Sequence, residues 1–203
     1  MKKCVAGVLL VSFLALSAHA QDARQGWFIT LDAGLDSMSL VSDTGTDNFG
    51  QGSSLTLGGG YEFSLRPNVA LLLGGMYDLD YYLQGGSGSE GTSFKSAAET
   101  INQKIRYSFY IAPGLYVRED TLLYGKAAYV VSKTDPAGVR SADPNFNGFG
   151  FGAGIRYALT PRSFLALEFQ RVTNNSVAFP EFRSGLAISP TYTNYTLGLV
   201  YKP

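Results

Sequence analysis

The chain has 203 residues, and its sixteen Lys and Arg residues equal its sixteen Asp and Glu residues. This charge balance excludes the basic surface that a nucleic-acid partner requires. The length suits a single domain, and the single cysteine, Cys4, excludes a disulfide framework.

Residues 1–20 have the features of a secretory signal peptide. Two lysines follow the first Met, residues 5–16 are apolar, and Ala18 and Ala20 supply the small residues that precede a cleavage site. We therefore expect cleavage near Ala20 and a mature domain of residues 21–203. This mature domain has no Cys and no His, and its net charge is −2 because two of the sixteen bases leave with the signal.

Eight segments of the mature chain alternate between apolar and small or polar residues, with the period of two that indicates β-strands. In the first segment, for example, Trp27, Ile29 and Leu31 alternate with Thr30 and Asp32. Segments of about nine to eleven residues can cross a bilayer when they are tilted, whereas no apolar run after the signal is long enough for a transmembrane helix. The predicted strands are, in chain order, residues 26–40, 53–65, 69–82, 103–117, 121–132, 147–159, 163–173 and 191–201.

Short and long connections alternate between these segments. The short ones are turns that contain Pro, Asn or Asp, at residues 66–68, 118–120 and 160–162. The long ones are polar, at residues 41–52, 84–100, 133–146 and 174–190. This alternation is typical of barrels with short periplasmic turns and long external loops, and an even strand count predicts both chain ends on the periplasmic side.

The two strand faces distinguish a soluble β-sandwich from a membrane barrel. One face consists mostly of small residues, namely Gly, Ser, Thr and Ala, with a few charged ones. Such residues suit the filled interior of an eight-stranded barrel. The other face carries aromatic residues near the strand ends, as the aromatic girdles of membrane barrels do. We therefore predict an all-β, eight-stranded antiparallel up-and-down transmembrane β-barrel, with a soluble sandwich as the alternative. The predicted girdle residues are Trp27, Tyr61, Phe63, Tyr77, Tyr81, Tyr107, Tyr129, Phe149, Tyr157, Phe169, Tyr195 and Tyr201.

Over essentially its whole mature length, the chain resembles the small outer-membrane barrels of the OmpA, OmpX and Ail type. In the last segment, Gly198 is followed three positions later by the aromatic Tyr201, which is similar to the signal that the barrel-assembly machinery reads. Pro203 stands at the last position, where Phe is usual in that signal. The resemblance implies a bacterial outer-membrane location and contact with outer-membrane lipid and lipopolysaccharide. We expect no cofactor and no metal.

Nine charged residues fall on the predicted inward faces. A buried charge is tolerated when it is paired and hydrogen-bonded, so we interpret the five acids and four bases as a salt-bridge network that fills the lumen. The alternative, which the resemblance to OmpA-type barrels allows, is a small gated pore in which Arg156 or Lys126 exchanges acid partners. The nine residues are Asp32, Glu62, Asp78, Asp80, Lys104, Arg106, Lys126, Arg156 and Glu168.

A run of alternate glycines at residues 148–154 superficially resembles a nucleotide-binding loop. Its strict period of two is that of a strand, however, and no helix follows to receive a phosphate. We interpret it as a glycine row on the lumen face that makes room for facing Tyr side chains.

The absence of His from the mature chain argues against an enzyme, because His is the usual general base near neutral pH. A carboxylate base such as Glu168 is the alternative. We predict instead a non-enzymatic surface protein whose external loops have a structural role or bind a host or surface ligand. Phe179 and Phe182, apolar residues in the fourth long connection, are the candidates for that binding. They could equally fold over the barrel mouth or contact lipopolysaccharide.

Overall fold

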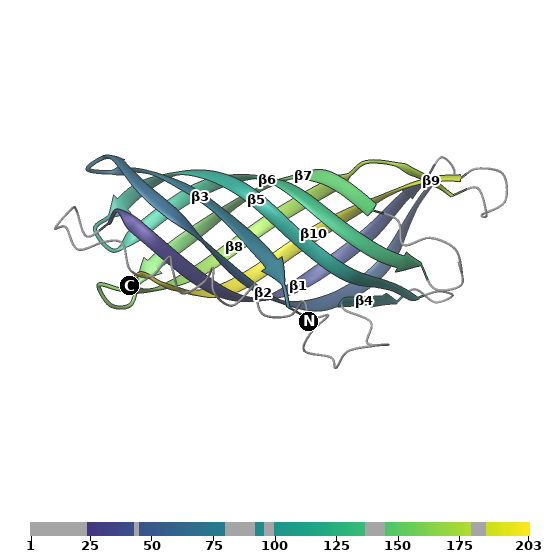
Figure 1. The fold of residues 1–203 in the computed structure, drawn as a ribbon, viewed down its shortest axis with the longest axis horizontal. Helices are drawn as coiled ribbons and strands as arrows, with labels where there is room; N and C mark the ends of the chain where they lie inside the picture. Colours follow the sequence, from purple (N-terminus) through teal and green to yellow (C-terminus); the bar gives the residue numbers. More distant parts are fainter. Residues whose placement is uncertain (1–23, 43–44, 80–91, 96–99, 137–144, 180–185) are drawn as a thin grey trace, which may run out of the picture.

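The computed structural model describes residues 24–42, 45–79, 92–95, 100–136, 145–179 and 186–203. These residues form one antiparallel sheet that closes into a barrel (Figure 1). The strands are β1 (Gly26–Ser42), β2 (Gly45–Arg66), β3 (Val69–Asp78), β4 (Thr92–Lys95), β5 (Thr100–Arg118), β6 (Thr121–Pro136), β7 (Asn145–Ala158), β8 (Ser163–Asn174), β9 (Val177–Phe179) and β10 (Leu186–Tyr201).

Eight long strands make the wall in the order β1-β2-β3-β5-β6-β7-β8-β10, and β10 pairs back onto β1 from Ile29↔Tyr201 to Ser42↔Ile188. The short strands β4 and β9 pair with β5 and β10, respectively. The prediction of an eight-stranded up-and-down antiparallel barrel is therefore confirmed. The three short turns, the start of β1 and the end of β10 lie at one end, here called the turn end, and the opposite end is the loop end (Figure 1).

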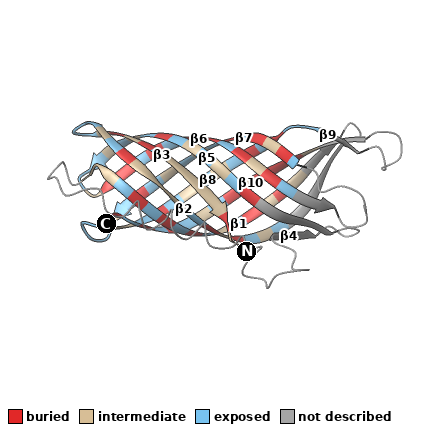
Figure 2. Cartoon of the chain, in the orientation of Figure 1, coloured by how far each residue is buried: buried red, intermediate tan, exposed pale blue. Residues whose placement is uncertain are grey.

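The period of two in the sequence corresponds to the two faces of the barrel wall. In β7, Phe149 and Phe151 are 63% and 67% exposed on the outward face, whereas Phe146 and Arg156 are buried on the lumen face. Figure 2 shows this alternation of buried and exposed positions along the strands. The apolar face is thus the outward one, the reverse of a soluble sandwich.

The first external connection is shorter than the sequence predicted. We expected a polar loop at residues 41–52, but β1 and β2 stay paired up to Ser42↔Gly45, with a register shift between Ser37 and Ser39. Strands β4 and β9 likewise lie within predicted loops. Residues 41–52 and β4 are mostly polar, and β9 has only three residues, so none of these segments shows the hydrophobic alternation that indicates a strand, even though the backbone is paired.

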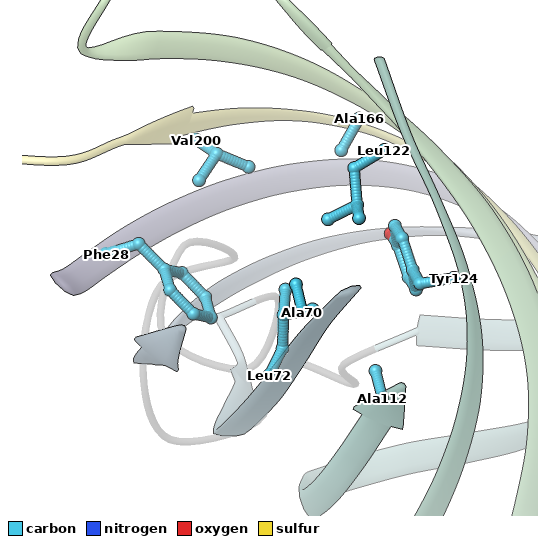
Figure 3. Close-up of a cluster of buried hydrophobic side chains, with 8 residues drawn as sticks. All are labelled: Phe28, Ala70, Leu72, Ala112, Leu122, Tyr124, Ala166 and Val200. Atoms are coloured by element: carbon cyan, nitrogen blue, oxygen red, sulfur yellow. The ribbon is translucent and has the colours of Figure 1, made fainter. Parts of the chain in front are cut away.

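Two clusters of buried apolar side chains fill the lumen between its charges. The cluster near the turn end joins Phe28 of β1 to side chains from β3, β5, β6, β8 and β10 across the lumen (Figure 3). Its members are Phe28, Ala70, Leu72, Ala112, Leu122, Tyr124, Ala166 and Val200. The cluster toward the loop end consists of Met38, Ala128, Val130, Val172 and Tyr192. The lumen is therefore a packed interior rather than an empty tube.

Lumen-facing glycines allow large side chains to lie against the wall. A Cβ at Gly154 would overlap the ring of Tyr124, as the glycine-row interpretation predicted for a facing Tyr. The other glycines of that row face different partners, because Gly150 and Gly152 lie against Gln170 and Gly148 lies against Asn174. A facing Tyr is therefore found at Gly154 only, and the interpretation is wrong about the residues that face the other three glycines.

Candidate functional site

Charged side chains cross the lumen in three layers along the barrel axis. Each layer combines acids and bases from strands that are distant in sequence. The turn-end layer contains Glu62, Arg156 and Lys202. The middle layer contains Asp32, Lys126 and Glu168. The loop-end layer contains Asp36, Asp78 and Arg106.

The turn-end layer is built around Glu62 of β2, which is 1% exposed. Its Oε2 lies 3.3 Å from Nη1 of Arg156 and 2.8 Å from Nζ of Lys202. Its Oε1 accepts a hydrogen bond of 2.5 Å from the hydroxyl of Tyr116. Lys202 also donates to the carbonyl oxygen of Arg24, 2.5 Å away, and so links the ends of β1, β2 and β10. One carboxylate here serves two buried cations.

Aromatic rings border the cations of the turn-end layer. The guanidinium of Arg156 lies 4.8 Å from the ring centroid of Phe28 and 6.0 Å from that of Tyr124. The ammonium of Lys202 lies 5.2 Å from the ring of Phe164. Such contacts favour a desolvated cation. Lys202 was not among the predicted lumen charges, although it directly follows β10 and has the even-numbered parity of that strand's inward residues, such as Gly198.

The middle layer contains a tight ion pair and a separate acid. Nζ of Lys126 lies 2.5 Å from Oε1 of Glu168, 3.3 Å from the sulfur of Met76 and 4.6 Å from the ring centroid of Tyr110. Asp32 is 5% exposed and accepts a hydrogen bond of 2.8 Å from Oγ1 of the nearby Thr30. Among the described residues, none forms an ion pair with Asp32.

The loop-end layer places one base between two acids. Nη2 of Arg106 lies 2.8 Å from Oδ2 of Asp36 and 3.2 Å from Oδ2 of Asp78. Asp36 is fully buried, at 0% exposure. Asp36 was not predicted as a member of the network, although its position in β1 has the same parity as that of Asp32.

Some predicted site residues cannot be placed by side chain. Asp80, Tyr81 and Phe182 lie outside the described residues. The backbones of Lys104 and Phe179 lie in β5 and β9, but their side chains are not among those that the structure describes. The structure therefore brings together seven of the nine predicted lumen charges and adds Asp36 and Lys202 to them.

Two small cavities lie on either side of the Lys126–Glu168 pair. The turn-side cavity has a volume of about 20 Å³ and the loop-side cavity about 40 Å³. Both are bordered by Met76, Glu168 and Thr196. Because one buried water needs roughly 10–15 Å³, these cavities have room for a few water molecules. Within the described part of the barrel, the charged layers therefore alternate with water-sized spaces.

The outward face carries the predicted girdle residues that the structure describes. Their side chains range from half-buried, as for Tyr61 and Tyr77, to 63% exposed for Phe149. Rings pair across neighbouring strands, with centroids 5.1 Å apart for Trp27–Tyr61 and 5.6 Å apart for Tyr129–Phe149. One pair joins β1 to β2 and the other joins β6 to β7, and such aromatic contacts fit the girdles of a barrel in lipid.

Some kinds of site are absent from the described residues. No group of three or more His, Cys, Asp or Glu side chains in them could hold a metal ion. None of them forms a helix long and apolar enough to cross a membrane.

A closed barrel with an apolar outward face and a charged, filled lumen defines a small membrane-spanning β-barrel. The model of the outer membrane protein beta-barrel domain family matches residues 6–202. The chain belongs to this family, which confirms the resemblance to small outer-membrane barrels.

Solved structures of other barrels are similar to the chain at low sequence identity. Neisserial surface protein A has the same fold and is 14% identical, with a TM-score of 0.54, over 88% of this chain and 97% of that chain. Ail, the attachment invasion locus protein of Yersinia pestis, is 13% identical, with a TM-score of 0.47, over 88% and 99%. OprG from Pseudomonas aeruginosa is 11% identical, with a TM-score of 0.49, over 89% and 97%. No curated protein sequence matches the chain.

Proposed function

We propose that the chain is a non-enzymatic surface protein of the bacterial outer membrane whose loop end binds a host or surface ligand. The observation that supports this most is that the strands of the barrel stay paired beyond the outward apolar side chains, toward the loop end. On β1 the last outward apolar side chain that the structure describes is that of Leu35, yet β1 remains paired with β2 and β10 up to Ser42. Seven further residues of strand span roughly 20 Å, which makes the loop end a rigid platform.

The base of the fourth external segment is fixed to this platform. Asn174 donates from Nδ2 to the carbonyl of Pro190 at 3.0 Å, and Ser189 donates to the carbonyl of Asn174 at 2.6 Å. Oδ1 of Asn175 accepts from the backbone N–H of Asn147 at 2.8 Å. A segment anchored at both ends loses less conformational entropy when it binds a ligand. This supports the fourth segment, which includes Phe179 and Phe182, as the binding segment.

The adhesive role predicts a segment-specific loss of attachment. We expect the double variant Phe179→Ser, Phe182→Ser, displayed on bacteria, to bind cultured cells or extracellular matrix about tenfold less than wild type, because apolar anchors dominate protein interfaces. The matched control is Val139→Ser, which removes an apolar residue from the third segment and should retain binding. Cell-bound bacteria are counted, with surface levels equalised by antibody staining. Equal binding by the double variant and wild type contradicts the assignment.

A second candidate, a small gated pore, is favoured by the position of Arg156 beside the turn-side cavity. Two acids that could replace its partner Glu62, namely Asp32 and Glu168, border the same cavity. A switch of Arg156 toward either acid would rearrange the turn-end layer without moving the backbone.

The pore candidate predicts altered conductance when this layer is broken. In planar bilayers, we expect Arg156→Ala and Glu62→Ala each to change the single-channel conductance or open time by at least about twofold, because each removes one member of the switch. Lys133→Ala, an exposed residue near the loop end, is the control that should behave as wild type. Unchanged channels in both lumen variants would eliminate the gate.

A further inference from the structure

Asp32 differs from the other described lumen acids in its surroundings. Asp36, Glu62, Asp78 and Glu168 each lie within 3.3 Å of a Lys or Arg side chain. Asp32 is only 5% exposed, and its Oδ1 accepts from Thr30, but no described residue donates to its Oδ2. A buried carboxylate without a cation is costly unless something compensates its charge.

Asp32, which has no ion pair, borders the turn-side cavity of about 20 Å³. The other polar residues that line the cavity are Thr30, Tyr110, Tyr124, Thr196, Glu168 and the cation Arg156. Carboxylate and hydroxyl oxygens are the ligands that hard cations prefer. The volume is that of one or two water molecules, and therefore of one small ion.

The charge count of the described lumen indicates the valence of such an ion. The turn-end layer has one cation in excess, because Glu62 pairs with both Arg156 and Lys202, and Arg156 also borders the cavity. The other two layers each have two acids and one base. The described lumen therefore holds five acids and four bases, and a single monovalent cation beside Asp32, the acid without an ion pair, would balance them.

Close packing holds Asp32 in this position. Its Oδ1 lies against the backbone of Gly198 on β10, where any Cβ would overlap it. The carboxylate therefore lies between β1 and β10, at the seam that closes the barrel, and glycine at residue 198 leaves the space for it.

We propose that the turn-side cavity is a binding site for a small monovalent cation such as Na⁺, with Asp32 as its principal ligand. The site lies beyond the proposed surface function, since it requires neither a loop ligand nor a conducting lumen. By neutralising a buried charge at the closing seam, the ion stabilises the folded barrel.

Thermal unfolding in different chloride salts tests the proposal. The refolded protein, held in a zwitterionic detergent, is compared in LiCl, NaCl, KCl and choline chloride at equal ionic strength, because choline is too large for the cavity. Trp27, the only tryptophan in the chain, reports unfolding by its fluorescence. We expect the midpoint to be about 5 °C higher in NaCl than in choline chloride. Equal midpoints for wild type in the two salts would overturn the proposal.

Two variants test whether the difference in unfolding midpoint between NaCl and choline chloride depends on Asp32. Asp32→Asn keeps the shape of the side chain but removes the charge, and should abolish the difference between NaCl and choline chloride. Asp36→Asn, which removes an equally buried acid that already has a cationic partner, should retain the difference. A salt difference that persists in Asp32→Asn overturns the site. So does a wild-type midpoint that responds to pH but not to Na⁺, since a protonated Asp32 needs no ion.

If Asp32→Asn fails to fold, binding of Na⁺ to the wild-type barrel is measured directly by titration calorimetry. Wild-type barrel equilibrated in choline chloride is titrated with NaCl at constant ionic strength. We expect saturable heat with one ion per chain. Heat that is no different from the detergent blank contradicts the site.

Discussion

Glu62→Gln is expected to destabilise the barrel by about 3–5 kcal/mol, because it leaves two buried cations without their shared carboxylate. The carboxylate of Glu62 holds both Arg156 and Lys202 and accepts from Tyr116. A neutral amide of the same shape removes the charge without opening a cavity. The loss is measured as the free energy of unfolding in urea, with Trp27 fluorescence as the signal in lipid vesicles.

Lys202→Met is the matched control for this prediction. It removes one cation but leaves Glu62 with Arg156 and Tyr116, so no charge in the layer remains unpaired. We expect a loss of about 1–2 kcal/mol, from the lost hydrogen bonds to Glu62 and to the carbonyl of Arg24. If Lys202→Met costs as much as Glu62→Gln, the layer is not organised around the carboxylate.

The sequence predicted the positions of these charges better than their partners. Parity along a strand decides which face a residue occupies, so the alternation of residue types was sufficient to assign Glu62 and Arg156 to the lumen. Their pairing joins residues 94 positions apart, and it depends on strand register around the closed barrel. Register is fixed by backbone pairing, such as Ile29↔Tyr201, which hydrophobic alternation does not specify.

Residues beyond the apolar segments were the ones most easily missed. Lys202 follows the last apolar residue of β10, so its role in the lumen was not apparent, although its parity was available. The early start of β2, at Gly45 instead of the predicted residue 53, was missed because residues 45–52 are mostly polar or glycine and give no alternation. Asp32 shows the opposite case, since its inward position was predicted but its lack of a cation appears only in the packed structure.

Gly60→Ala is expected to cost about 3 kcal/mol, since overpacking of a filled interior forces the wall to move. A Cβ at residue 60 would overlap the carbonyl oxygen of Leu73 and lie 2.8 Å from the Cα of Gly74 and 2.9 Å from Cζ of Phe28. Two of these contacts are backbone atoms of β3, so a side-chain rotation cannot relieve them. Phe28 in turn lies under the guanidinium of Arg156, so the strain also reaches the turn-end layer.

Gly125→Ala makes the same chemical change on the outward face. No atom lies within 4 Å of a Cβ built there, so the substitution should be neutral or stabilise the barrel by up to about 1 kcal/mol, through the lower entropy of the unfolded chain. Both variants are unfolded in urea in the same vesicles as wild type. A similar loss in the two would show that glycine is required for backbone conformation throughout the wall. A loss confined to Gly60→Ala would show that the lumen is packed to its limit where β2 meets β3.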